Sequence, residues 1–211
     1  MLALTEVDPK PYVEMVERLG GEPQLICVDF NSVEFEEEIK LIDGLILFGD
    51  SLESTALNGT TTNHLGEKLL KYAFSRDIPV LGIGLGIHLL NLVFGGSLSS
   101  DINGHHDFDK DGNDISAYHR IYISPGSKLA AIVGSGGFVR VNSRHKFGIR
   151  ESNKSSHLLA SAYSLDDGVI EGLESPDHTW VIGVQFHPER RMELPPHFER
   201  LFQSFIERVS G

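Results

Sequence analysis

Short apolar stretches alternate with amphipathic helical patterns over the first hundred residues, and this alternation limits the possible folds more than any other feature of the chain. Strands are predicted at residues 2–4, 23–28, 44–48 and 80–83, and helices at residues 11–19, 35–42, 64–74 and 87–94. Buried apolar strands that alternate with helices are typical of a parallel sheet covered on both faces. Ligands of such sheets bind beyond the carboxyl ends of the strands.

The pattern changes at about residue 97. A polar, loop-like stretch over residues 97–113 is followed by closely spaced apolar segments, which predict strands at residues 118–123, 138–141, 157–163, 168–173 and 179–184. A final helix is predicted over residues 195–209. We therefore expect one α/β domain over residues 1–211, with a mostly parallel central sheet and a small antiparallel addition.

The segment Gly82-Ile83-Gly84-Leu85-Gly86-Ile87-His88 follows an apolar run directly and precedes a helical pattern. A strand that turns sharply into a helix at such a segment forms a nucleophile elbow, which lifts one side chain above the end of a sheet. The residue at the tip is Gly84, which has no side chain that could attack a substrate. The frame of a catalytic site is thus predicted without its nucleophile.

Two further segments complete the pattern. Val141-Asn142-Ser143-Arg144-His145 ends one predicted strand, and Gly183-Val184-Gln185-Phe186-His187-Pro188-Glu189 ends another. A histidine followed two residues later by a glutamate suits a general base whose imidazole is oriented by a carboxylate. His187 and Glu189 are therefore the predicted base and its partner, although the pair could equally be retained for structural reasons alone.

These segments resemble the class I glutamine amidotransferases, and among them the γ-glutamyl-γ-aminobutyrate hydrolase group, peptidase family C26. The resemblance covers nearly the whole chain, and the segment 183–189 is its most specific match. It implies a flavodoxin-like three-layer α/β sandwich. It also implies a Cys-His-Glu triad that cleaves a γ-glutamyl amide through a thioester, with no cofactor.

Carried onto this chain, the resemblance makes His187 the base and Glu189 its partner, and it places the missing nucleophile at Gly84. The backbone N–H groups of Gly49 and Leu85 would form the oxyanion hole. His88, Ser143 and His145 would contact the ligand, a γ-glutamyl compound or an amino acid. The structural alternative for His88 is a satisfied histidine on a helix face, and for Ser143 a turn residue.

The chain departs from the family at more than one position around this site. The family has a cysteine where this chain has Gly84, usually a glutamine where it has His88, and His-His-Gln where it has His145 followed by Lys146 and Phe147. We therefore expect a protein that has lost thiol catalysis and keeps ligand binding. The alternative is an active hydrolase of γ-glutamyl amides that uses water or another nucleophile with His187 and Glu189; Cys27 is a less favoured nucleophile.

A separate acidic stretch, residues 107–113, places Asp107, Asp109 and Asp111 at alternate positions before Gly112, as at the start of a calcium loop. The closing glutamate of such a loop is absent, because Tyr118 stands there. The preceding His105 and His106 would suit a softer metal instead. A solvated acidic loop without metal is the favoured interpretation, so no metal is expected.

The charge balance narrows the possible partners. The 18 basic and 30 acidic residues give a net charge of −12, which argues against nucleic acids and anionic membranes as partners. A single cysteine allows no internal disulfide, and neither a secretory signal nor a membrane span is recognisable. We expect a cytoplasmic protein that forms a homo-oligomer or joins a partner synthase subunit.

Overall fold

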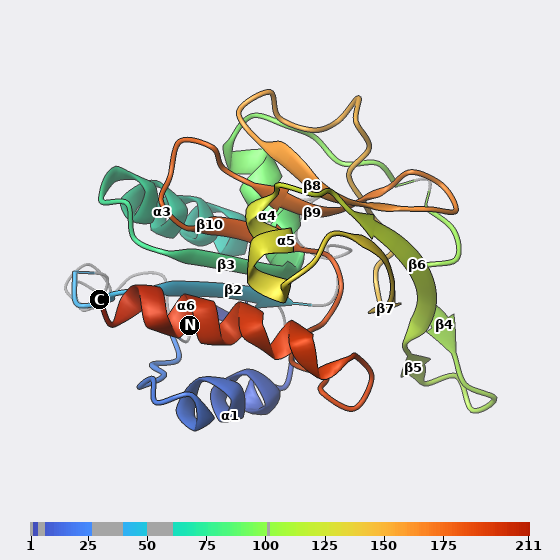
Figure 1. The fold of residues 1–211 in the computed structure, drawn as a ribbon, viewed down its shortest axis with the longest axis horizontal. Helices are drawn as coiled ribbons and strands as arrows, with labels where there is room; N and C mark the ends of the chain where they lie inside the picture. Colours follow the sequence, from blue (N-terminus) through green and yellow to red (C-terminus); the bar gives the residue numbers. More distant parts are fainter. Residues whose placement is uncertain (1, 4–6, 27–39, 50–60, 101) are drawn as a thin grey trace.

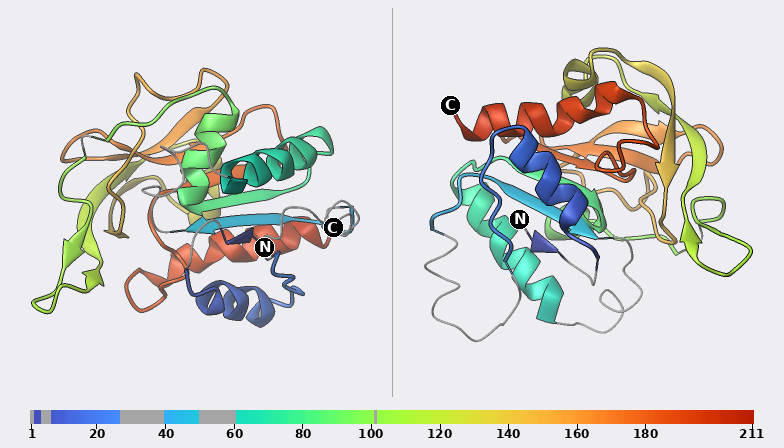
Figure 2. Two further views of the ribbon diagram at one scale, coloured as in Figure 1. Left: turned by 180° about the vertical axis from the view of Figure 1, so that it is seen from behind. Right: turned by 90° about the horizontal axis from the view of Figure 1, so that it is seen from below.

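The computed structural model describes residues 2–3, 7–26, 40–49, 61–100 and 102–211 (Figure 1). An eight-stranded sheet runs through the described part of the molecule in the order β1-β2-β3-β10-β9-β8-β6-β7. Its strands are β1 (Leu2–Ala3), β2 (Leu45–Gly49), β3 (Val80–Gly84), β6 (Ala117–Ile123), β7 (Gly137–Ser143), β8 (Leu159–Ser164), β9 (Ile170–Glu174) and β10 (Val181–Val184). A small hairpin of β4 (Asp107–Phe108) and β5 (Asp114–Ile115) projects beyond the sheet (Figure 2).

The sheet is mixed, with one parallel half and one antiparallel half. Strands β1, β2, β3 and β10 pair in parallel, whereas β10-β9, β9-β8, β8-β6 and β6-β7 pair antiparallel. The predicted α/β class is confirmed, but the prediction of a mostly parallel sheet with a small addition is wrong. After residue 117 the strands are connected without long crossover helices, so neighbouring strands run in opposite directions.

Helices cover both faces of the parallel half. The helices are α1 (Lys10–Arg18), α3 (Thr61–Ser75), α4 (Leu85–Val93), α5 (Lys128–Val133) and α6 (Arg200–Val209), with a 3₁₀ turn η1 (Pro196–Glu199). Alternate residues of β2 face opposite layers: Ile46 and Phe48 pack with α1 and α6, and Leu45 and Leu47 pack with α3 and α4. The described chain thus forms three layers, with α1, α5 and α6 on one side and α3 and α4 on the other (Figure 1).

The secondary structure agrees with the sequence patterns except near glycines and short elements. α4 begins at Leu85, two residues earlier than predicted, because the strand turns into the helix at Gly84 without a connecting loop. The β4-β5 hairpin replaces part of a predicted loop, and the six-residue helix α5 was not predicted. The predicted strand 23–28 is wrong for its described part, because residues 23–25 form no strand and Ile26 makes only a single β-bridge. The rest of that segment, including Cys27, and most of the predicted helix 35–42 and loop 51–63 lie outside the described residues. No described helix has the length and apolarity needed to span a membrane.

Candidate functional site

The predicted elbow is present at the junction of β3 and α4. Gly84 has φ 56° and ψ −109°, a backbone conformation with positive φ that residues other than glycine rarely adopt. The turn is tight because α4 packs directly on the neighbouring strand, where a Cβ on Gly86 would overlap the carbonyl oxygen of Leu47. Gly84 is buried, so in this conformation the tip of the elbow faces protein.

His187 faces the tip of the elbow. β10 pairs with β3 in parallel, so the segment that follows β10 leaves the sheet beside Gly84. A Cβ built on Gly84 would lie 3.0 Å from Cε1 and 3.4 Å from Nε2 of the His187 imidazole. A nucleophile at this position would therefore come within reach of the nitrogen that is predicted to act as a base.

Glu189 orients the imidazole of His187. Its Oε1 lies 2.9 Å from Nδ1 of His187, and both side chains are buried. The hydroxyl of Tyr12 donates to the same oxygen at 2.9 Å. The carboxylate thus has one partner from the loop after β10 and one from α1, which fixes the imidazole with Nε2 toward the elbow. The role of Tyr12 was missed, because 177 residues of sequence separate it from Glu189.

Asn142, at the end of β7, fixes the backbone of His187. The amide N–H of His187 donates to Oδ1 of Asn142 at 2.9 Å, and Nδ2 of Asn142 donates to the carbonyl oxygen of His187 at 3.1 Å. Nδ2 also donates to Oε2 of Glu193 at 2.9 Å. The three sequence segments that suggested a site are thereby brought together in space.

The backbone near the predicted oxyanion hole contains one donor and one acceptor. Leu85 is the first residue of α4, where backbone N–H groups have no partner inside the helix, so its amide suits the predicted role. Gly49 pairs with Gly84 across β2 and β3, and its carbonyl oxygen would overlap a Cβ on Gly84. Gly49 thus places an acceptor against the elbow. The oxyanion hole stays a prediction.

The three predicted ligand contacts are buried in this structure. Burial lowers the pKa of His88 to about 3, with the charge of His145 acting in the same direction, so the imidazole is neutral at pH 7. Ser143 donates its hydroxyl to the carbonyl oxygen of His105 at 2.8 Å. Nδ1 of His145 lies 2.8 Å from the carbonyl oxygen of Phe147. Their roles in ligand binding stay predictions.

The residues whose side chains could share a metal ion are not those of the acidic loop 107–113. The carboxylate of Asp109 accepts hydrogen bonds from the backbone of Asp111 and Asn113 at 2.8 and 2.9 Å, which orders the β4-β5 turn. Within the described residues, ligand atoms close enough to share an ion belong to His105, His145 and Glu171. The sequence pointed to His105 but not to Glu171, which is the second residue of the buried strand β9.

Comparison with known proteins identifies relatives over almost the full length of the chain. The peptidase C26 family matches residues 5–189. A protein of Schizosaccharomyces pombe (strain 972 / ATCC 24843), named as a candidate glutamine amidotransferase, is 33% identical, with 94% of this chain and 81% of the relative aligned. CTP synthase of Methanosphaera stadtmanae is 24% identical; the alignment covers 95% of this chain but only 41% of that enzyme.

Solved structures share the fold at lower identity. A protein of Thermoplasma acidophilum, described as a candidate component of GMP synthase, superposes with a TM-score of 0.72 at 18% identity, covering 99% of this chain and 92% of the other. The glutaminase domain of Trypanosoma brucei CTPS gives a TM-score of 0.66 at 18% identity, with the same coverage. At this identity the likeness establishes the fold alone.

Proposed function

The chain belongs to the peptidase C26 family of class I glutamine amidotransferase-like proteins, and from this premise we propose that it has lost thiol catalysis and keeps the binding of a γ-glutamyl or amino-acid ligand. One observation carries the proposal. Gly84 has an elbow conformation, and the imidazole of His187 faces the place where a nucleophilic side chain would stand. The proposed base thus faces a position that has no side-chain atom for it to activate.

The hydrogen bonds around His187 support the proposal that the site still binds a ligand. Glu189 and Asn142 hold His187, and Tyr12 holds Glu189, by hydrogen bonds of 2.9 to 3.1 Å from different parts of the chain. His88, Ser143 and His145 remain the side chains proposed to recognise the ligand. The flavodoxin-like plan implied by the family is supported by the helices on both faces of the parallel half.

A second function, slow hydrolysis by water, is favoured by the same base. Water would reach Nε2 of His187, whose other nitrogen is held by Glu189, only after the neighbours of Gly84 move, because even a Cβ on Gly84 would overlap the carbonyl oxygen of Gly49. General-base activation of water accelerates a reaction by about 10²- to 10⁴-fold. Without a covalent intermediate the difficult step is not divided in two, so turnover is expected to be far below that of a cysteine enzyme.

Assembly with a separate synthase protein is the arrangement that we propose. The relatives include CTP synthases, much longer than this chain, and a structure named as a synthase component. Two measurements distinguish the predicted assemblies. Co-purification with a synthase would indicate the complex, and a homo-oligomer alone in size-exclusion chromatography would indicate self-assembly.

Catalysis and binding are tested on the purified chain. Release of ammonia or amine from glutamine and γ-glutamyl amides is measured for the unchanged protein, for His187→Ala and for His157→Ala, an exposed histidine that serves as control. Calorimetric titration with the same compounds measures binding. We expect binding without turnover above the level of His187→Ala. Turnover that His187→Ala abolishes and His157→Ala preserves would establish the hydrolase instead. Absence of both binding and turnover would refute both functions.

A further inference from the structure

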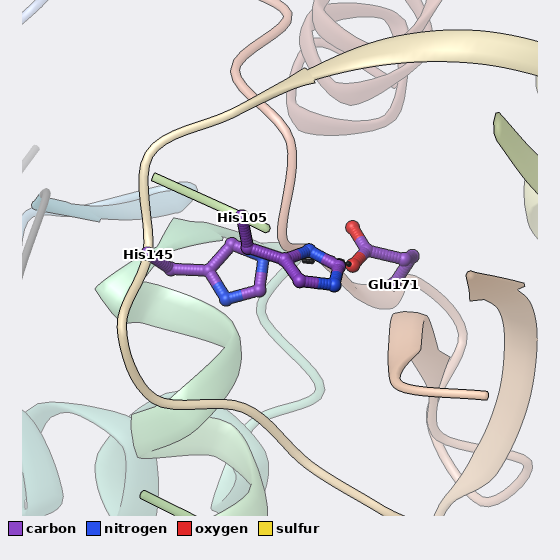
Figure 3. Close-up of side chains that lie close together, drawn as sticks. All are labelled: His105, His145 and Glu171. Atoms are coloured by element: carbon purple, nitrogen blue, oxygen red, sulfur yellow. Dashed lines mark ion pairs between the residues drawn. The ribbon is translucent and has the colours of Figure 1, made fainter. Parts of the chain in front are cut away.

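Three histidines converge on one carboxylate that lies wholly inside the protein. Glu171, in β9, has no exposed surface. Its Oε1 lies 3.4 Å from Nδ1 of His105, 3.5 Å from Nε2 of His145 and 3.3 Å from Nε2 of His119. These side chains come from the loop before β4, from the segment after β7, and from β6 and β9. Figure 3 shows the rings of His105 and His145 beside the carboxylate.

We propose that His105, His145 and Glu171 form a binding site for a divalent transition-metal ion, of which Zn²⁺ is the best fit. Their ligand atoms all lie within 4.8 Å of one another. Tetrahedral zinc with bonds of about 2.0–2.1 Å places neighbouring ligand atoms roughly 3.3 Å apart. The separations of 3.4 and 3.5 Å between the carboxylate oxygen and the two imidazole nitrogens agree with that spacing.

Hydrogen bonding leaves the converging atoms of Glu171 and His145 available to an ion, whereas Nδ1 of His105 also lies 3.4 Å from Oγ of Ser143. Among the described residues, neither oxygen of Glu171 has a hydrogen-bond partner, and neither does Nε2 of His145. Three buried polar atoms without partners are costly, because each loses its hydration without compensation. A cation bound by Oε1 of Glu171 and Nε2 of His145 would satisfy both of these atoms at once.

The other nitrogen of each ligating imidazole has the partner that metal sites usually provide. Nδ1 of His145 lies 2.8 Å from the carbonyl oxygen of Phe147, so this nitrogen carries the proton. Nε2 then presents a lone pair toward the carboxylate. Nε2 of His105 lies 3.4 Å from Oδ2 of Asp167, which leaves Nδ1 to face Glu171. A carboxylate or a carbonyl behind each histidine is the arrangement that fixes the tautomer of metal ligands.

The chemistry of the donor set selects the ion. Two imidazoles and one carboxylate suit zinc and related first-row metals, whereas calcium and magnesium prefer oxygen ligands alone. Ser143 borders the same space, with Oγ 3.4 Å from Nδ1 of His105. His119 approaches the same carboxylate oxygen, with Nε2 3.3 Å from Oε1 of Glu171, and its ring contacts that of His105 at 4.4 Å between centroids. It supports Glu171 and is not needed as a ligand.

A metal ion at this site would link segments of the chain that lie beside the candidate catalytic residues. The backbone carbonyl of Glu171 accepts from the N–H of Gln185 at 2.9 Å, two residues before His187. An ion held by His105, His145 and Glu171 would therefore join the loop before β4 to the segments that carry the ligand contacts. This proposal does not depend on the proposed function, because metal binding is measured without any substrate.

The competing account is a protonated imidazole. Burial raises the pKa of Glu171, but the imidazoles of His119 and His145 lower it by more, so the carboxylate is ionised at pH 7. Burial lowers the pKa of His119, and the adjacent carboxylate of Glu171 raises it by more. An imidazolium at His119 would neutralise the carboxylate without a metal. The two accounts differ in the metal content of the protein.

The test uses the full-length chain, stripped with chelator and then titrated with Zn²⁺ or Co²⁺. We expect about one ion per chain, a melting temperature raised by several degrees, and the visible d–d absorption of Co²⁺ in a tetrahedral nitrogen and oxygen site. Glu171→Gln and His145→Gln should weaken metal binding at least tenfold. His157→Gln, at an exposed position, and Asp109→Asn, at a half-buried one in the β4-β5 turn, should not weaken it.

A milder variant keeps the test decisive if the buried substitutions unfold the protein. Asp167 is partly exposed, so Asp167→Asn should fold, and loss of the carboxylate behind His105 should weaken binding about 10- to 100-fold. Less than a tenth of an ion per chain after reconstitution, with no change in melting temperature, would overturn the proposal in favour of the imidazolium. Binding that Asp167→Asn leaves unchanged and Asp109→Asn abolishes would also overturn it, by placing the ion in the β4-β5 turn.

Discussion

Replacing Gly84 by alanine measures how much the empty elbow stabilises the fold. At φ 56° and ψ −109° a residue with a Cβ is strained by about 1–3 kcal/mol. The new Cβ would also overlap the carbonyl oxygen of Gly49 and lie 3.0 Å from Cε1 of His187, so the neighbours must move. For a domain of this size, 1 kcal/mol corresponds to about 2–4 °C, so Gly84→Ala should lower the melting temperature by about 2–12 °C.

Gly84→Cys then tests the geometry of the base. Its thiol would stand beside Nε2 of His187 and at the N-terminus of α4, two environments that lower the pKa of a thiol from about 8.5. The assay is the rate of alkylation by a haloacetamide as a function of pH, followed by mass spectrometry. The unchanged protein reports the reactivity of Cys27 alone. Adding His187→Ala to Gly84→Cys should return the thiol pKa toward 8.5.

Gly126→Ala is the matched control for strain. Gly126 also has a positive φ, 86°, but a Cβ there would have no neighbour within 4 Å, so it reports backbone strain without overlap. The reasoning fails if Gly84→Ala melts at or above the temperature of the unchanged protein, or no lower than Gly126→Ala. It also fails if the thiol of Gly84→Cys titrates near 8.5 whether or not His187 is present.

Three further predictions concern the residues around the base. Tyr12→Phe removes the hydrogen bond to Glu189 and should lower the free energy of unfolding by about 1–3 kcal/mol in urea titrations; an unchanged value would show that the bond does not matter. Asn142→Asp loses the donor to the carbonyl of His187 and places a second carboxylate beside Glu193, so it should destabilise the protein more at pH 7 than at pH 4, as measured by thermal melting. Because the pKa of His88 is about 3 in the folded protein and near 6.5 in the unfolded chain, only the unfolded chain takes up this proton as the pH falls from 6.5, so stability decreases toward acid. In chelator-treated samples, the unchanged protein should lose about 2 kcal/mol more than His88→Gln between pH 6.5 and 5, and equal losses would contradict this.

The sequence was most informative where a pattern is local. The apolar strands and the helices between them are set by periodicity, so the α/β class and most elements were predictable. The mixed character of the sheet was not predictable, because the direction in which two strands pair depends on how the connections within residues 117–184 bring the chain back to the sheet. The hairpin β4-β5 and the helix α5 are too short to give a clear pattern.

By itself, the sequence determined the chemical types at the site: a glycine where the family has a nucleophile, and a histidine followed by a glutamate after an apolar strand. These depend only on residue identity and spacing. Only the tertiary structure decided which atoms meet. It placed Tyr12 on Glu189 across 177 residues, and it gathered His105, His145 and Glu171 around one point inside the protein. The reason is physical: contacts between distant segments follow from the packing of the strands and helices that carry them, and no local pattern encodes that packing.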